Sequence, residues 1–490
     1  MEWTRAARYR AYDQYSALEL MKLQAQATAS PAQLHYHIRP QSGLLNDPNG
    51  FSYFNGEWTV FYQSFPFGAA HGLKSWVRLS SPDLVHWTNH GVAVLPDSDF
   101  DSHGAYSGSA HEVDGKLFLM YTGNHRDADW TRTPYQLGAW LDQDGRVTKL
   151  AQPLIDQPET VTEHFRDPQL FFHGDRWYAL LGAQRATDQR GEMLLYSAPA
   201  VTGPWTAVGP IKLPLADLGY MVECPNLISV DGVPTFVFCP QGLPQAAASY
   251  QNIYPNMYLQ GKDFDYQAAT LEGAGELTNL DEGFDVYASQ TFNAPDGTAY
   301  LISWVGLPDM AYPTDEQNWA NCLSQVKELH QVDGQLVQQP VAAMTSLRQE
   351  EHRFAGEVET ITPDGGQQLE LAVTIAANQQ GTLYLAASVD RKQSVQLRFD
   401  TAAGELVIDR ATSGPQPTPD HGTTRTLKLP AKADLKLRLF LDHSLAEVFV
   451  NDGRQVATFR YFTSQENTAL AFDRPTTASG SWWQLADQNQ

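Results

Sequence analysis

Apolar and aromatic runs alternate with short polar turns through the first 340 residues of the chain. Five times, two such runs flank a turn dipeptide: Asn55-Gly56, Asp114-Gly115, Gly174-Asp175, Asp231-Gly232 and Asp296-Gly297. Turn dipeptides of this kind between aromatic strands are a strong signal for β-hairpins. Successive turns are about 60 residues apart, and a regular spacing of this length is typical of repeat architectures.

Each turn predicts one hairpin. The predicted strand pairs are 51–54 with 58–63, 109–113 with 117–121, 169–172 with 177–181, 226–230 with 234–238, and 289–292 with 299–304. A second pair follows in at least two units, at 76–80 with 85–87 and at 137–140 with 146–148. Four strands in each of five units predict a five-bladed β-propeller. Two stacked β-domains with coincidental turn spacing are the alternative.

The two ends of the chain follow other patterns. Residues 4–27 favour helix and contain no Pro or Gly, and Ser30-Pro31 ends the helical segment. From about residue 356, apolar and polar residues alternate, as in 369–375, 395–399, 435–441 and 446–450, which predicts a β-sandwich. We therefore expect an all-β protein with an N-terminal helical extension (1–33), a propeller (34–340), a linker (341–355) and a β-sandwich (356–490).

Charge and cysteine content narrow the classes of partner. Lys and Arg number 33 against 56 Asp and Glu, a formal net charge of −23, which disfavours nucleic acid and anionic membranes as partners. Three cysteines without paired spacing support neither a disulfide framework nor a zinc site. The first 30 residues lack the apolar core of a signal peptide, and no apolar stretch is long enough to span a membrane. We expect a cytoplasmic protein, and leave a homodimer open.

Three acids occupy matching places in the predicted repeat. Asp47, Asp167 and Glu223 each lie seven or eight residues before a hairpin turn, and each has a Pro next to it or close behind. Equivalent positions of propeller blades face one axis, so these carboxylates should converge; Tyr106 and Ser107 hold the same offset in the second unit. Solvated acids at strand starts are the alternative. Clustered carboxylates without metal-ligand spacing favour glycosyl chemistry with no metal and no cofactor.

The motifs Asn46-Asp47-Pro48-Asn49-Gly50, Arg166-Asp167-Pro168 and Glu223-Cys224, in this order, resemble those of the β-fructofuranosidases of glycoside hydrolase family 32. Residues 442–453 also resemble a motif of that family's sandwich. The resemblance implies a retaining mechanism with Asp47 as nucleophile, Glu223 as acid and base, and Asp167 holding fructose hydroxyls. It further implies a fructosyl pocket lined by Asn46, Gln63, Tyr106, Ser107, Arg166 and Tyr287. Arg166 would also keep its neighbour Asp167 ionised.

The segment His71-Gly72-Leu73-Lys74-Ser75-Trp76 is similar to that of intracellular sucrose-6-phosphate hydrolases. His71, Lys74 and Arg78 would place cations near the pocket rim, where a phosphate on the glucosyl group can bind; ordinary surface charges are the alternative. Trp76 is placed with them among the substrate-binding residues.

The resemblance thus implies hydrolysis of sucrose 6-phosphate to glucose 6-phosphate and fructose. Alternatives within the class are unphosphorylated sucrose or short fructo-oligosaccharides as substrate, and fructosyl transfer in place of hydrolysis. A non-catalytic sugar-binding propeller is the alternative from another class. In each case the partner is a small sugar.

Overall fold

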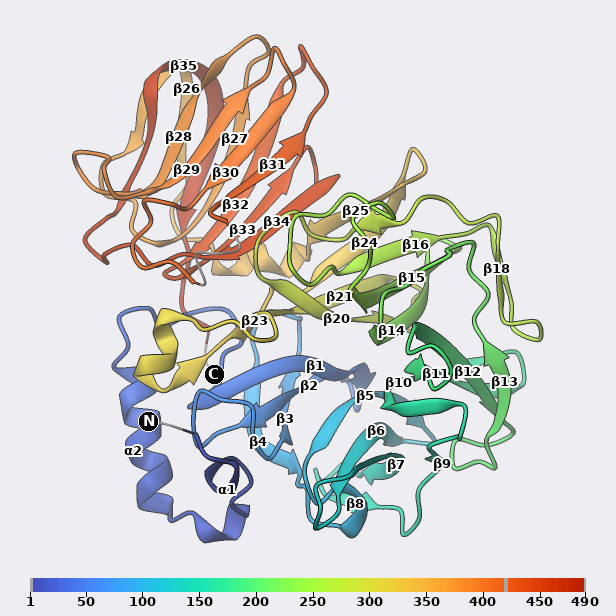
Figure 1. Cartoon of the computed structure of the whole chain (residues 1–490). Coiled ribbons are helices and arrows are strands. Elements are labelled where there is room, and N and C mark those ends of the chain that lie inside the picture. The colour runs from blue at the N-terminus through green and yellow to red at the C-terminus, as the bar shows by residue number, and fades with distance from the viewer. Residues whose placement is uncertain (1–2, 418–421, 489–490) are drawn as a thin grey trace.

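Five antiparallel sheets surround a common axis and form a five-bladed propeller (Figure 1), as predicted. The computed structural model describes residues 3–417 and 422–488, so the predicted outer limits at residues 1 and 490 lie outside the described part. Blade I contains β1 (Gly43–Phe54), β2 (Glu57–Phe65), β3 (Ser75–Ser81) and β4 (Thr88–Val94). A short late strand, β22 (Trp319–Ala320), pairs in parallel with β1 and so ties the end of the propeller to its beginning.

The other four blades repeat this plan. Blade II contains β5 (Ala105–Val113), β6 (Lys116–Arg126), β7 (Arg132–Leu141), β8 (Val147–Lys149) and β9 (Ile155–Asp156). Blade III contains β10 (Val161–His173), β11 (Arg176–Arg185), β12 (Gly191–Ala198) and β13 (Thr206–Pro210). Blade IV contains β14 (Met221–Val230), β15 (Val233–Gln241), β16 (Met257–Gln260) and β19 (Thr278–Asn279), with the small hairpin β17 (Asp263–Asp265) and β18 (Thr270–Glu272) beside them in sequence. Blade V contains β20 (Val286–Asn293), β21 (Ala299–Val305), β23 (Cys322–Leu323), β24 (Lys327–Val332) and β25 (Gln335–Pro340).

All five predicted hairpins form, but one outer strand was placed wrongly. Residues 85–87 are not a strand, and β4 begins at Thr88. The reason is a side-chain-capped turn: Asp83 Oδ1 accepts hydrogen bonds from the backbone N–H groups of Val85 (3.0 Å) and His86 (2.9 Å). An Asp that bonds to the backbone two and three residues ahead favours a turn over an extended strand.

The N-terminal helix is interrupted, which differs from the continuous helix predicted for 4–27. The structure has α1 (Arg5–Arg8), a 3₁₀ turn η1 (Tyr12–Gln14) and α2 (Ala17–Thr28). Ser16 and Glu19 form a capping box that starts α2 afresh. Between the helices, the Tyr12 hydroxyl donates to Ser75 Oγ (2.8 Å), and the Tyr15 ring stacks on Phe67 at 3.4 Å. Docking of these aromatic rings on blade I therefore outweighs local helix propensity.

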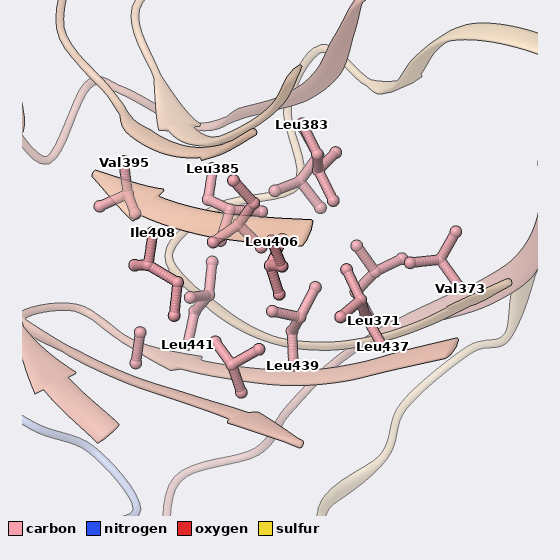
Figure 2. Packing of buried hydrophobic residues seen from close by; sticks show 14 of the residues in the cluster. Leu371, Val373, Leu383, Leu385, Val395, Leu406, Ile408, Leu437, Leu439 and Leu441 are labelled. Atoms are coloured by element: carbon pink, nitrogen blue, oxygen red, sulfur yellow. The ribbon is translucent and has the colours of Figure 1, made fainter. Parts of the chain in front are cut away.

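The C-terminal part is a β-sandwich whose two layers share the long strand β35 (Ala469–Gln484). The sheet order is β31-β30-β29-β28-β35-β27-β32-β33-β34, and β26 also pairs with β35. Apolar side chains of the facing layers fill the space between them, among them Leu371, Leu385 and Leu439 (Figure 2). The strands are β26 (His352–Thr362), β27 (Gln368–Ile375), β28 (Gln380–Ala387), β29 (Val395–Asp400), β30 (Glu405–Asp409), β31 (Thr424–Lys428), β32 (Leu435–Asp442), β33 (Leu445–Val450) and β34 (Gln455–Arg460).

Buried charges join the sandwich to the propeller. The His37 ring, fully buried before blade I, contacts Asp442 Oδ2 (2.9 Å) and Glu447 Oε1 (3.1 Å) of the sandwich. Arg410 Nη1 of the sandwich lies 2.9 Å from Asp285 Oδ2 of the propeller. Charges buried at such a junction must be paired to be tolerated, so these pairs fix how the two parts meet.

Residues 3–417 and 422–488 also contain the 3₁₀ segments η2 (Asp99–Asp101), η3 (Pro313–Gln317) and η4 (Ala342–Leu347), which connect strands. Within the described residues, no helix is long and apolar enough to cross a membrane.

Candidate active site

The three candidate acids lie in the innermost strands of three blades, at places where strand pairing is interrupted. Asp47 lies in β1, Asp167 in β10 and Glu223 in β14, and the register with the neighbouring strand shifts at or next to each of them. Asp167 (φ +63°) and Cys224 (φ +47°) adopt left-handed backbone conformations there. Such bulges turn a side chain away from its regular direction and are common at active sites.

The structure brings the carboxylates together at the propeller axis. Cys224 Sγ lies 3.7 Å from both Asp47 Oδ2 and Asp167 Oδ2, and therefore between these two acids. Arg166 joins the third acid to the group, because its Nη2 lies 2.6 Å from Glu223 Oε1 and its Nε lies 3.9 Å from Asp167 Oδ2. Residues from all five innermost strands line the small cavity beneath them.

Asp47 is surrounded by hydrogen-bond donors. Asn46 Nδ2 donates to Oδ1 (3.1 Å), Gln63 Nε2 donates to Oδ2 (3.2 Å), and the Ser107 hydroxyl donates to the same Oδ2. Burial raises the pKa of Asp47, while the bonds from Ser107 and Asn46 and the charge of Lys74 oppose that rise. The charge of Glu223 adds to the rise, so the pKa of Asp47 stays raised, and the donors and Lys74 limit how far it rises.

Arg166 bonds to Glu223 rather than to Asp167, its expected partner. Tyr287 donates its hydroxyl to the other oxygen of Glu223 (2.6 Å), so both carboxylate oxygens have a partner. Asp167 instead accepts a hydrogen bond from the backbone N–H of Cys224 (3.0 Å). Burial is the main reason that the pKa of Asp167 is raised, and Arg166 only partly counteracts it. Arg166 thus acts on Asp167 in the predicted direction, but burial outweighs it and raises the pKa of Asp167 to about 7.

Lys74 does not lie at the rim, where it was expected. Only 3% of this residue is exposed, and its Nζ donates to Asn46 Oδ1 behind Asp47. His71 is an exposed residue, but desolvation of its imidazole by the surrounding protein and the charges of Lys74 and Arg8 hold its pKa well below the usual value. The neutral imidazole of His71 and the ammonium group of Lys74, which is bonded to Asn46, are poor partners for a phosphate.

Trp76 and Arg78 also differ from their predicted places. Trp76 is completely buried, so it cannot contact substrate; its Nε1 donates to the backbone oxygen of Tyr106 (3.0 Å). Arg78 lies near Glu57 at the blade I hairpin turn, at the end of the strands away from the acids. Residues 76 and 78 share one face of β3, and Trp76 on that face packs against the ring of Tyr121 of blade II.

Cys224 of the Glu223-Cys224 motif contacts two of the acids. Two further residues of the site were not predicted from the sequence: His164 Nδ1 lies 2.9 Å from Arg166 Nη1, and Arg132 Cζ lies 5.2 Å from the centre of the Tyr106 ring. His164 stands three residues before Asp167, outside the Arg166-Asp167-Pro168 motif. Arg132 belongs to a hairpin that carries no motif.

A larger cavity, of about 540 Å³, opens at the other end of the propeller. Its lining residues, such as His111, Phe171 and Tyr266, lie toward the hairpin turns. None of the three acids reaches this cavity, so the chemistry belongs to the end where the acids meet.

Comparison with known families accounts for nearly the whole chain. The model "Glycosyl hydrolases family 32 N-terminal domain" matches residues 37–340, and "Glycosyl hydrolases family 32 C terminal" matches residues 340–484. The chain belongs to glycoside hydrolase family 32. It is thus a glycoside hydrolase of the β-fructofuranosidase type, as the motifs indicated.

Relatives within this family are similar over their full length. Sucrose-6-phosphate hydrolases of Pediococcus pentosaceus (46% identical, covering 99% of this chain and 97% of the relative) and Streptococcus mutans (42%, 98% of each) are two of them. The solved structure of sucrose-6-phosphate hydrolase from Lactobacillus gasseri has a TM-score of 0.98 and 52% identity and covers 100% of both chains. The family 32 β-fructofuranosidase BmSUC1 of Bombyx mori has a TM-score of 0.84 at 27% identity, covering 96% of this chain and 98% of that one.

Proposed function

We propose that this enzyme hydrolyses sucrose 6-phosphate to glucose 6-phosphate and fructose, with retention of configuration at the fructosyl anomeric carbon. The observation that carries the proposal is the convergence of Asp47, Asp167 and Glu223 at one end of the propeller. The substrate follows from the similar relatives that are named sucrose-6-phosphate hydrolases.

In the first step, an oxygen of Asp47 attacks C2 of the fructosyl unit. The bond from C2 to the bridging oxygen breaks, and Glu223 gives its proton to that oxygen as glucose 6-phosphate leaves. The donors Asn46, Gln63 and Ser107 hold the Asp47 carboxylate in one orientation before the attack. Such preorganisation lowers the reorganisation needed to reach the transition state.

In the second step, Glu223 takes a proton from water, and the resulting hydroxide attacks C2 and releases fructose from Asp47. Arg166 and Tyr287 bond to the two oxygens of Glu223 and keep its carboxylate in place through both steps. Asp167 contributes by holding fructose hydroxyls, and the hydrogen bond from the Cys224 N–H fixes its Oδ2 beside the Cys224 thiol.

The proposed substrate also bears on where the enzyme acts. A phosphorylated disaccharide is anionic and is held inside the cell that makes it, so the proposal includes a cytoplasmic enzyme. A homodimer remains a prediction.

The test is turnover of sucrose 6-phosphate and of sucrose by the purified full chain. We expect glucose 6-phosphate and fructose as products, and a higher kcat/KM for the phosphorylated substrate. Asp47→Asn should remove turnover of both substrates, because its amide is a far weaker nucleophile than a carboxylate. Equal kcat/KM values for the two substrates would contradict the proposed preference for sucrose 6-phosphate. Normal turnover by Asp47→Asn would contradict the assignment of Asp47 as nucleophile.

A further inference from the structure

We propose that Arg126 and Arg132, paired across the two ends of the loop that joins β6 to β7, bind the 6-phosphate of the glucosyl unit. We call residues 125–132 the arginine hairpin. The inference rests on the proposed function and supplies the phosphate partners for which His71, Lys74 and Arg78 are not suited.

Arg132 has buried donors without a partner. Its Nε and Nη2 atoms are shielded from solvent and make no hydrogen bond to any residue that the structure describes. Its guanidinium lies over the ring of Tyr106, with Cζ 5.2 Å from the ring centre. Leaving charged donors buried and unsatisfied costs free energy, and an anion bound to Arg132 would satisfy them.

Arg126 pairs with Arg132 across the two strands and also has a buried guanidinium nitrogen without a hydrogen-bond partner among the described residues. Its Nη1 donates to the backbone oxygen of Trp130 (2.9 Å), while its buried Nε has no partner among the described residues. The hairpin's own carboxylates are engaged elsewhere. Asp127 contacts the His125 ring (3.1 Å), and Asp129 accepts a hydrogen bond from the Thr131 N–H (3.0 Å).

The local charge is positive in a protein that is strongly negative overall. Burial lowers the pKa of Arg132, and the cationic neighbours Arg166 and Arg126 lower it further. Arg166 is engaged with Glu223, which leaves Arg132 and Arg126 as neighbouring arginines with no bonded carboxylate in the part of the chain that the structure describes. Paired guanidinium groups suit a dianionic phosphate, because each can bond two oxygens.

The arginine hairpin borders the acids through Tyr106. The next residue, Ser107, donates its hydroxyl to Asp47, and the charge of Asp167 is close enough to act on Arg132. The glucose 6-phosphate leaving group must lie on the solvent side of the three acids, toward the mouth of the pocket. An arginine above Tyr106 is therefore placed for the glucosyl side of the substrate.

The N-terminal segment supports the arginine hairpin from outside. The ring of Tyr9 packs edge-on against Trp130, with ring centres 5.2 Å apart, and Arg5 Cζ lies 4.1 Å from the centre of the same Trp130 ring. These contacts hold Trp130, whose backbone oxygen in turn fixes Arg126. The role of the broken N-terminal helix is thus to hold one wall of the phosphate site.

The test compares kcat/KM for sucrose 6-phosphate and sucrose in Arg132→Gln and Arg126→Gln. Each substitution should lower the ratio of the two values by roughly 10- to 100-fold, the effect expected for loss of a charged hydrogen bond. Arg132→Lys keeps the positive charge but loses the planar guanidinium with its paired donors. It should lower the ratio of the two kcat/KM values less than Arg132→Gln does. The matched control is Arg185→Gln on blade III, an exposed arginine paired with Asp188 (2.8 Å), whose ratio should equal that of the wild type.

A second readout separates phosphate binding from a packing defect. Glucose 6-phosphate should inhibit the wild type more strongly than glucose does, and this difference should shrink in Arg132→Gln. If the wild type prefers sucrose 6-phosphate and both variants keep that preference, the arginine assignment is overturned while the proposed function stands. If the wild type shows no preference, the proposed substrate fails first, and the arginine assignment fails with it.

Discussion

The ammonium group of Lys74 acts on Asp47 in two ways. Its bond to Asn46 Oδ1 turns the amide so that Nδ2 faces Asp47, and its charge opposes the rise in the pKa of Asp47. Burial lowers the pKa of Lys74 itself to about 7. The group is therefore charged below about pH 7 and acts on Asp47 there.

Lys74→Met should move the acidic limb of the kcat/KM profile to higher pH. The substitution removes the positive charge that lowers the pKa of Asp47, so protonation of the nucleophile sets in earlier as the pH falls. A displacement of roughly one pH unit is expected for one neighbouring charge. Lys116→Met, at an exposed lysine of blade II paired with Asp142, is the control. An acidic limb that stays in place, or moves to lower pH, would contradict this role.

At the residue scale, the sequence indicates which acids meet but not which way their neighbours point. Asp47, Asp167 and Glu223 could be selected because they share an offset from a turn. The burial of Trp76 depends on the face of β3 that packs on blade II, where its ring contacts Tyr121. Lys74, just before β3, also meets blade II, since its backbone oxygen accepts a hydrogen bond from the Ala105 N–H (2.9 Å). Contacts between side chains of different blades carry no local signal.

At the level of the elements, close approach of blades III and IV sets the distance between their acids. Gly182 of β11 lies against the backbone of Val222, the residue before Glu223; a methyl group at Gly182 would lie 2.0 Å from the Val222 oxygen. No side chain fits this gap, so the two strands can pack closely only with glycine there.

Gly182→Ala should therefore lower both stability and activity. Overpacking of this kind costs about 1–3 kcal/mol, and displacement of β14 would move Glu223 away from the other acids. The measurements are the free energy of unfolding and kcat/KM. Gly275→Ala is the control, since a methyl group there meets its nearest atom, the Gln260 oxygen, at 3.8 Å. Similar effects of both substitutions would argue against a tight blade contact.

Elements bounded by strong turns were predictable, and those bounded by tertiary contacts were not. The five hairpins follow from their turn dipeptides. The start of β4 depends on the turn capped by Asp83, and the break in the N-terminal helix depends on Tyr12 and Tyr15 docking on blade I. Helix propensity alone is a weak guide when such contacts compete with it.

At the scale of the whole molecule, His37 links the propeller to the sandwich. Its ring lies between Asp442 and Glu447, and these carboxylates raise its pKa to about 9 although burial opposes the charged form. The family motif at 442–453 thus contributes to domain docking through its first acid and Glu447. Its hydrogen-bonding role was not evident from the sequence, because its partner lies some 400 residues earlier.

The His37 contacts should make stability depend on pH. A histidine pKa raised from 6.5 to about 9 stabilises the fold fully below pH 6.5, and this contribution is lost as the pH rises through 9. The expected loss is on the order of 3 kcal/mol. Denaturant unfolding of the wild type and of His37→Gln, between about pH 6 and pH 9.5, measures it.

His37→Gln should reduce the slope of the free energy of unfolding against pH between about pH 6 and pH 9.5. Asp281 and Glu282, whose pKa values are raised to about 6 and about 7, titrate mainly at lower pH and remain in the variant. Equal pH slopes for the two proteins above pH 7 would show that His37 does not carry this dependence.

The central claim is double displacement at C2 through Asp47, and the stereochemistry of transfer tests it most directly. Sucrose 6-phosphate is turned over with methanol as a competing acceptor, and NMR identifies the anomer of the first methyl fructofuranoside formed. Two inversions, by Asp47 and then by methanol activated at Glu223, predict the β-anomer. The α-anomer, formed by a single displacement, would contradict the account.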